Sequence, residues 1–284
     1  MIIEALFLAK DLEGTAKKSI VLIDVLRTSA TLATMLKSGA RNVIVASRPE
    51  EARAHRDRLG ECLLCGESGG RRLPDFDYGN SPSDYARLDL AGKQIVFTSS
   101  NGAKAMAQLV GEGRRLFIGS YPNAAAVVRA ALADAERRSA DIAIVGSGGD
   151  MGTRYGIEDC HCAGFLVDLL FQQMTGQPNW AEVGQAGDLH HIGEKWALQD
   201  SAFMALQLYR SLGLDFDRIV QRSVDGQNLR TLGLDVDFPD CLVVDSTDVV
   251  PEVTVSPEGY LLVNPDGSLS DRARSLPPCG EPTG

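Results

Sequence analysis

Short apolar runs alternate with alanine-rich stretches over the first 175 residues of the chain. The runs are five to eight residues long, which suits buried strands, and the stretches between them have the length and spacing of helices. Such an alternation predicts crossover helices and a mainly parallel sheet with helices on both faces. The predicted pairs are SIVLIDVL with 29–38, NVIVA with 49–59, QIVFT with 103–110, RLFIG with 123–138 and DIAIVG with 158–175, while an irregular loop follows ECLLC.

The pattern changes beyond residue 175. TGQPNWAEVGQAGDLHH predicts a loop, 194–211 predicts an amphipathic helix, and CLVVDS and GYLLVNP predict two strands. The last residues are rich in proline, glycine and charge, which is typical of a flexible end. We therefore expect three parts: an α/β phosphate-binding portion at 1–175, a helical and mixed α+β portion at 176–270 packed on it, and a flexible tail at 271–284.

Composition narrows the class of partner. The chain has 28 Lys and Arg against 38 Asp and Glu, a formal charge of −10, and no long basic run, so we expect neither nucleic acid nor a membrane as a partner. Its apolar runs are far shorter than the roughly 20 residues that span a bilayer. Six cysteines in 284 residues do not indicate a disulfide framework. We expect a cytoplasmic protein with free thiols.

Small and polar residues follow four of the predicted strands. These first loop residues are DVLRTS, TSSNGA, GSYPNA and GSGGDMG. The carboxyl ends of parallel strands meet at one edge of a sheet, where helix N-termini offer unpaired N–H groups. Each loop on its own is equally explained by helix capping and tight turns, but the four together favour a shared anion site.

Carboxylates stand at or near the same loops. Hard oxygen ligands beside anion-binding loops are the combination expected for Mg²⁺-assisted phosphate chemistry. Asp24 ends an apolar run ahead of a helix, so its burial would be costly without a cation or a hydrogen-bond donor, and Arg27 or a metal is the natural partner. Glu158 and Asp159 have a simpler alternative, because acids in the first turn of a helix stabilise its dipole. The candidates are Asp24, Glu67, Asp75, Asp77, Asp150, Glu158 and Asp159.

Two other motifs suggest different chemistry. CGESGGR at 65–71 has the spacing of cysteine-dependent phosphatases, but RRLPDF after it does not predict the helix that those sites require. GSGGDMG resembles a dinucleotide-binding loop, but Met151 stands where the third glycine belongs. We therefore expect neither a catalytic cysteine nor a bound dinucleotide.

Several segments resemble signatures of the 2-phosphosulfolactate phosphatase family, the ComB-type phosphatases linked to coenzyme M synthesis. They are IDVLRTSAT at 23–31, GESGGRRLPDFDYGNSP at 66–82, SSNGA at 99–103, GSYPN at 119–123, GIEDCHCAG at 156–164 and SVDGQNLRTLGLDVDFPDCLVVDSTDVVP at 223–251. The resemblance implies a ComB-like α/β fold, Mg²⁺, and hydrolysis of (2R)-O-phospho-3-sulfolactate to 3-sulfolactate and phosphate. The substrate would be a small anionic phosphomonoester, and we expect a homo-oligomer, a dimer.

The resemblance also suggests roles for single residues. We expect Asp24, Arg27 and Glu67 to be catalytic, with Arg27 clamping the phosphate or sulfonate. Asp24 could attack phosphorus, or water could attack directly. The metal ligands would come from Asp24, Glu67, Glu158 and Asp159, directly or through water. Substrate would bind to Asn80, Ser81, Asn101, Gly102, Ser120 and Asn123.

One departure from the family pattern bears on the substrate. The family commonly carries an arginine after the glutamate of this loop, whereas Ser68 follows Glu67 here. A guanidinium suits oxyanions better than a hydroxyl does, so Arg71, Arg72 or Arg154 would have to supply the missing charge. Alternatively, the chain hydrolyses another small phospho-hydroxyacid or binds an anion without catalysis.

Overall fold

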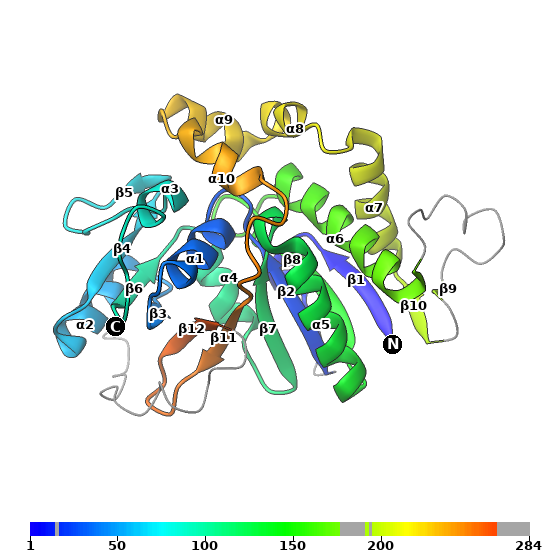
Figure 1. Ribbon diagram of the computed structural model, residues 1–284, viewed down its shortest axis with the longest axis horizontal. Coiled ribbons are helices and arrows are strands. Elements are labelled where there is room, and N and C mark those ends of the chain that lie inside the picture. The colour runs from blue at the N-terminus through cyan, green and yellow to red at the C-terminus, as the bar shows by residue number, and fades with distance from the viewer. Residues whose placement is uncertain (15–16, 177–190, 193–194, 266–284) are drawn as a thin grey trace.

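The structure, a computed structural model, describes residues 1–14, 17–176, 191–192 and 195–265. The predicted tail and most of the predicted loop after residue 175 lie outside the described residues. Within the described part, twelve strands form one sheet in the order β5-β4-β6-β3-β12-β11-β7-β2-β8-β1-β10-β9 (Figure 1). Their bounds are β1 Ile2–Leu6, β2 Lys18–Ile23, β3 Asn42–Val45, β4 Leu63–Ser68, β5 Arg71–Arg72, β6 Gln94–Thr98, β7 Arg114–Gly119, β8 Asp141–Gly146, β9 His191–Ile192, β10 Trp196–Leu198, β11 Pro251–Val255 and β12 Leu261–Pro265.

The sheet consists of two parallel groups joined by an antiparallel hairpin. Strands β4, β6 and β3 run parallel to one another, and so do β7, β2, β8, β1 and β10. The hairpin β11–β12 lies between the groups and pairs antiparallel with β7 on one side and β3 on the other. The predicted mainly parallel α/β sheet is confirmed. The division of the chain at residue 175 stays a prediction, although β11 and β12 lie inside the sheet of the first portion.

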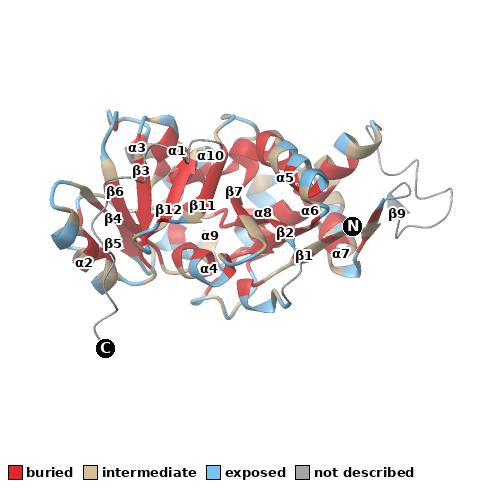
Figure 2. Ribbon diagram, turned by 90° about the horizontal axis from the view of Figure 1, so that it is seen from below, coloured by how far each residue is buried: buried red, intermediate tan, exposed pale blue. Residues whose placement is uncertain are grey.

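Successive apolar residues of a strand point to opposite faces of the sheet. Val21 and Ile23 of β2 face a cluster with α5, α6 and α7, while Ile20 and Leu22 face a cluster with α1 and α4. Helices therefore cover both faces of the buried sheet (Figure 2). The helices are α1 Thr28–Lys37, α2 Pro49–Leu59, α3 Pro82–Tyr85, α4 Gly102–Leu109, α5 Ala124–Arg138, α6 Ile157–Thr175, α7 Asp200–Leu212, α8 Phe216–Arg222, α9 Val224–Thr231 and α10 Phe238–Leu242, with short 3₁₀ turns at η1 Ala9–Asp11, η2 Tyr121–Asn123 and η4 Asp235–Asp237.

Two predicted elements after residue 175 are wrong. The run CLVVDS is not a strand: its first two residues end α10, which has Pro239 in its first turn, and the strand is PEVTV, now β11. The β-branched run was ambiguous, and pairing with β12 and β7 decides which segment is extended. The predicted helix at 194–211 begins only at Asp200, because Trp196 belongs to β10, which pairs with β1. Strand β1 itself was not predicted.

The parallel strands bring distant loops to one edge of the sheet. The loops after β2, β4, β6 and β8 meet at their carboxyl ends. The sequence predicted this for the loops after β2, β6 and β8, but it named the loop after β7 in place of the loop after β4. The segment from α8 to α10 lies over the same edge, at the top of Figure 1. Residues from the second half of the chain thus come next to the loops of the first half.

Among the helices that the structure describes, none is both long and apolar enough to cross a membrane.

Candidate active site

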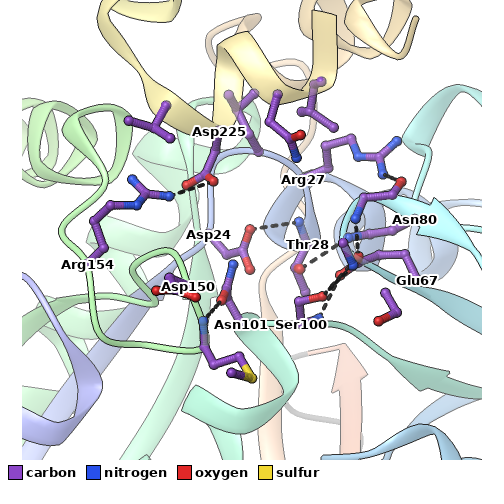
Figure 3. A pocket seen from close by; sticks show the side chains of 18 residues that line it. Asp24, Arg27, Thr28, Glu67, Asn80, Ser100, Asn101, Asp150, Arg154 and Asp225 are labelled. Carbon is purple, nitrogen blue, oxygen red and sulfur yellow. Dashed lines mark hydrogen bonds and ion pairs between the residues drawn. The ribbon is translucent and has the colours of Figure 1, made fainter. Parts of the chain in front are cut away.

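A pocket of about 550 Å³ lies where the four loops meet α9. Figure 3 shows Asp24 near its centre, with Glu67 and Asn80 to one side and Arg154 to the other. The loops after β2, β4, β6 and β8 and the residue Asn80 form its base and walls, and α9 closes it from above. The lining residues are Asp24, Leu26, Arg27, Thr28, Glu67, Ser68, Gly69, Gly70, Asn80, Ser100, Asn101, Asp150, Met151, Arg154, Val224, Asp225, Asn228 and Leu229.

Asp24 follows β2 and is almost completely buried, with 7% of its surface exposed. Its Oδ1 accepts a hydrogen bond of 3.2 Å from the Thr28 N–H, so the carboxylate also holds the first turn of α1. The pKa of Asp24 is raised to about 6, mainly by burial; the charges of Glu67 and Asp225 contribute to this rise, and the Thr28 donors partly offset it. Asp24 is therefore a buried acid that gains from a nearby cation.

Gly102 has a packing role against Asp24. A Cβ at this position would lie 2.6 Å from Asp24 Oδ2 and 2.9 Å from Thr28 Cγ2, which is closer than van der Waals contact allows. Gly102 is the first residue of α4 and is buried, and it does not line the pocket. The structure thus places this predicted substrate-binding residue behind the Asp24 carboxylate rather than in the pocket.

Glu67 is fixed by donors from two loops. Its Oε1 accepts a hydrogen bond of 2.6 Å from the Ser100 N–H, and its Oε2 accepts 2.6 Å from the Gly70 N–H and 3.1 Å from the Ser100 hydroxyl. Only 7% of Glu67 is exposed. A carboxylate offers about four lone-pair sites, so Glu67 keeps acceptor capacity for a ligand or cation after binding these donors. Glu67 joins the loop after β4 to the loop after β6.

Asn80 adds a polar group to the same side of the pocket. Its Nδ2 donates to Thr28 Oγ1 at 3.4 Å, and its backbone oxygen accepts from the Thr31 hydroxyl at 3.3 Å. Among the described residues, no hydrogen-bond partner is found for the buried Oδ1. A buried acceptor without a partner is costly, and an amide oxygen is a ligand that hard cations accept. Asn80 is therefore available to a bound group.

Arg27 does not pair with Asp24, contrary to the expectation from the sequence. Its Nη1 donates to Asp237 Oδ2 at 2.6 Å and its Nη2 to the Gly70 oxygen at 2.8 Å. Both side chains of the ion pair are buried, at 3% and 0% exposed. Ser81 donates to Asp237 as well, so this predicted substrate-binding residue supports the ion pair and does not line the pocket.

The opposite wall is formed by the loop after β8. Asn101 accepts a hydrogen bond of 2.9 Å from the Met151 N–H through Oδ1, which ties this loop to the start of α4. Asp150 and Met151 both adopt a positive φ, at 49° and 56°. Arg154 at the end of the loop donates to Asp225 of α9 at 2.8 Å. All five of these residues line the pocket.

Glu158 and Asp159 lie in the first turn of α6, behind the pocket wall rather than in its lining. Asp159 accepts from the Val25 N–H at 2.9 Å, and Glu158 Oε2 is buried with no hydrogen-bond partner in the described structure. Burial raises the pKa of Glu158 to about 7 and that of Asp159 well above its usual value, and neighbouring carboxylates add to both shifts. The simple helix-dipole explanation does not account for two acids this deeply buried.

Ser120 and Asn123 are not brought into the pocket. Asn123 Oδ1 accepts from the Ser120 N–H at 3.0 Å, and its Nδ2 donates to the oxygens of Ile118 at 3.1 Å and Val249 at 3.0 Å. The amide therefore fixes the turn after β7 and holds the strand that leads to β11. The loop after β7, one of the four that we expected to share an anion, has a capping role here.

The remaining candidates also have structural partners. Asp75 binds exposed Arg53 at 2.8 Å, and Asp77 accepts from the Leu64 N–H at 2.8 Å. Cys65 is completely buried, and burial raises its pKa to about 12, so the thiol is protonated at neutral pH. The prediction that Cys65 is not a nucleophile is consistent with this environment.

The pocket carries an excess of negative charge. Among the described lining residues, Asp24, Glu67, Asp150 and Asp225 outnumber the two arginines, so the formal charge is −2. No three His, Cys, Asp or Glu side chains of the described residues come together as a ready-made metal site. Mg²⁺ commonly takes only one or two carboxylates and completes its shell with water and substrate oxygens. Asp24, Glu67 and the Asn80 oxygen fit that donor chemistry.

Residues from the second half of the chain were missed as site residues. Asp225 and Asn228 line the pocket from α9, and Asp237 holds Arg27 from η4. Acids at helix starts are also normal dipole partners, so their spacing gives no signal of a site. Only the resemblance of the segment SVDGQNLRTLGLDVDFPD to the family could have indicated them.

The fold and pocket define an α/β protein with an acidic ligand site at the carboxyl edge of its strands. Residues 7–255 match the family described as 2-phosphosulpholactate phosphatase, and the chain belongs to this family. The chain is 34% identical over 263 residues to a probable 2-phosphosulfolactate phosphatase of Carboxydothermus hydrogenoformans. The aligned residues make up 93% of this chain and 97% of that protein. A protein of the same name from Deinococcus radiodurans is 32% identical over 231 residues, covering 81% and 85%. The resemblance predicted from the motifs is confirmed.

Proposed function

We propose that the protein is a Mg²⁺-dependent phosphatase that hydrolyses (2R)-O-phospho-3-sulfolactate to 3-sulfolactate and inorganic phosphate. One observation carries the proposal: two buried carboxylates of the family motifs, Asp24 and Glu67, line a single acidic pocket at the carboxyl edge of the sheet. The names of the similar proteins support the same substrate.

The charge of the pocket supports a divalent cation. A phosphomonoester is repelled by a pocket with a formal charge of −2, and a divalent cation held by Asp24 and Glu67 would cancel that net charge. When bound, Mg²⁺ would supply positive charge to the phosphoryl oxygens. Glu158 and Asp159 would support the site from behind the wall, because they lie outside the pocket lining.

The other groups of the pocket have positioning roles. Arg27, fixed by Asp237, presents its guanidinium at the pocket wall, where it favours an oxyanion. Asn80 and Asn101 add amide groups to the pocket, Asn80 to the right of Asp24 and Asn101 below it in Figure 3. Hydrogen bonds from Gly70 and Ser100 fix the Glu67 carboxylate in the absence of substrate, which limits the reorganisation that catalysis requires.

Asp24 has two chemically distinct roles open to it. It attacks phosphorus and forms an aspartyl-phosphate that water then hydrolyses, or it accepts the proton of a water that attacks phosphorus directly. A pKa raised to about 6 suits a base that is ionised at neutral pH. Acid quenching during turnover of ³²P-labelled substrate distinguishes them, since only the first route leaves label on the protein.

Phosphate release with and without Mg²⁺ tests the proposal. We expect the metal-free wild-type protein to release no phosphate from phosphosulfolactate, and Mg²⁺ to restore release. Asp24→Asn and Glu67→Gln should lose at least about 100-fold in kcat, in line with the loss of one preorganised electrostatic group. Asp75→Asn is the matched control, because Asp75 binds exposed Arg53 outside the pocket. Equal rates with and without metal contradict the Mg²⁺ requirement.

A second substrate is favoured by one observation. Ser68 is exposed and lines the pocket beside Glu67, where it offers a hydroxyl and no positive charge, so a phospho-hydroxyacid without a sulfonate is a candidate. A panel of plain and sulfonated phospho-hydroxyacids distinguishes the substrates by kcat/KM. Tight binding without phosphate release over hours would instead select a non-catalytic anion-binding protein.

A further inference from the structure

The two arginines of the pocket differ in how firmly they are held. Arg27 and its partner Asp237 are 3% and 0% exposed, and the guanidinium also donates to the Gly70 oxygen. Arg154 and its partner Asp225 are 33% and 25% exposed. A buried pair resists separation, whereas a partly exposed pair exchanges partners at little cost. Arg154 is therefore the arginine that can leave its internal partner for a ligand.

The backbone beside Arg154 is shaped for its guanidinium. A Cβ at Gly149 would lie 2.1 Å from Arg154 Nη2 and 2.8 Å from Asp225 Oδ2, so only glycine leaves room for the ion pair at this point. The Gly149 N–H donates to the Arg154 oxygen at 2.7 Å, and Arg154 Nη1 donates to the Tyr155 oxygen at 3.3 Å. These contacts hold the guanidinium at the pocket wall and leave it in reach of solvent.

The other two arginines that could replace the missing charge beside Glu67 do not reach the pocket. Arg72 donates to the Phe76 oxygen, and neither Arg71 nor Arg72 lines the pocket. Arg154 does line it, on the side of Asp24 opposite Glu67 (Figure 3). A substrate whose phosphate lies between Asp24 and Glu67 thus extends toward Arg154.

We propose that Arg154 is the specificity-determining residue that binds the second oxyanion of the substrate, its sulfonate or carboxylate. The assignment rests on the proposed function for the location of the phosphate. Asp225 holds the guanidinium until the ligand arrives, and the ligand oxyanion then replaces the Asp225 carboxylate. A planar guanidinium binds either oxyanion in the same two-pronged way.

Calorimetric binding of 3-sulfolactate and inorganic phosphate to the Mg²⁺-loaded protein tests the assignment without depending on turnover. Arg154→Gln should weaken 3-sulfolactate binding by about 10- to 100-fold more than phosphate binding, the range for one charged hydrogen-bonding partner. Arg154→Lys should restore part of the difference, because it keeps the charge and loses the planar fork. Lactate carries only the carboxylate and 2-hydroxyethanesulfonate only the sulfonate. The one whose binding Arg154→Gln weakens carries the group that Arg154 binds.

Arg71→Gln is the matched control, since it removes the same charge from an exposed residue outside the pocket. We expect it to leave the ratio of the two affinities unchanged. The assignment is overturned if Arg154→Gln weakens both ligands equally, if it matches Arg71→Gln, or if the wild type does not bind 3-sulfolactate. If the wild type and the Arg154 variants show the expected difference in binding but the wild type releases no phosphate from phosphosulfolactate, the proposed function fails and the assignment of Arg154 stands.

Discussion

The ion pair between Arg27 and Asp237 gives the sharpest prediction about stability. Asp237 is completely buried and accepts from Arg27 at 2.6 Å, from Ser81, and from Ser83 at 3.3 Å. Asp237→Ala therefore leaves a buried guanidinium and two hydroxyls without their acceptor. Removing one partner of a buried pair costs about 3–5 kcal/mol. That is a large share of the roughly 5–15 kcal/mol by which a domain is stable.

Urea unfolding followed by circular dichroism at neutral pH measures this loss. The matched control is Asp75→Ala, which breaks an ion pair with Arg53 whose side chains are 35% and 44% exposed. An exposed pair contributes only about 0–1 kcal/mol. Asp237→Asn keeps an acceptor oxygen and should lose less than Asp237→Ala. If Asp237→Ala costs no more free energy of unfolding than Asp75→Ala, burial does not decide the strength of these pairs and the reasoning is refuted.

Three further predictions concern the pocket and its surroundings. Gly102→Ala should lower kcat at least about tenfold, because its Cβ would lie 2.6 Å from Asp24 Oδ2 and displace that carboxylate; unchanged kinetics would show that Asp24 has room to move. Asp24→Asn should raise the free energy of unfolding above pH 6 in metal-free buffer, since the folded state raises the pKa of Asp24 from 3.8 to about 6 and so favours the neutral acid. That gain should vanish below pH 3.8, where the acid is neutral in both states, and a gain that persists there contradicts the assigned pKa. Iodoacetamide should leave phosphatase activity intact, because Cys65 is buried and its pKa is raised to about 12; rapid inactivation, absent in Cys65→Ser, would point to a thiolate nucleophile.

The first half of the fold could be predicted from the sequence because its signals are local. The strands β2, β3, β6, β7 and β8 each contain at least three consecutive apolar residues, and the helices after them begin within a few residues of the predicted positions. Such strands are buried on both faces, so their identity does not depend on a particular partner. Because these strands are parallel within each group, the sequence also predicted that loops at their carboxyl ends meet at one edge of the sheet.

The second half depends on pairing between distant segments. The segment that forms β11 lies between the two strands predicted at CLVVDS and GYLLVNP, and the sequence did not predict it as a strand. It is extended because it pairs with β12 on one side and β7 on the other. Trp196 shows the same effect, because its segment pairs with β1 at the other end of the chain. Local propensity cannot report contacts of this kind.

The candidate site shows the same division. Asp24 and Asn101 follow strands, Glu67 lies near the end of β4 and Asn80 lies in the loop before α3, and the structure brings all four to the pocket. The partner of Arg27 lies 210 residues further along the chain, so no spacing could indicate it. The loop residues near β7 had the same composition as the pocket loops but serve as caps, because side-chain type alone does not separate the two uses.

The central claim is that Asp24 belongs to the machinery of a Mg²⁺-dependent phosphosulfolactate phosphatase. The most direct measurement compares wild type and Asp24→Asn for release of phosphate and 3-sulfolactate from (2R)-O-phospho-3-sulfolactate in Mg²⁺. We expect the wild type to form the two products in equal amounts and Asp24→Asn, folded by circular dichroism, to form neither above background. Full activity of Asp24→Asn, or no products from the Mg²⁺-loaded wild type, would contradict the claim.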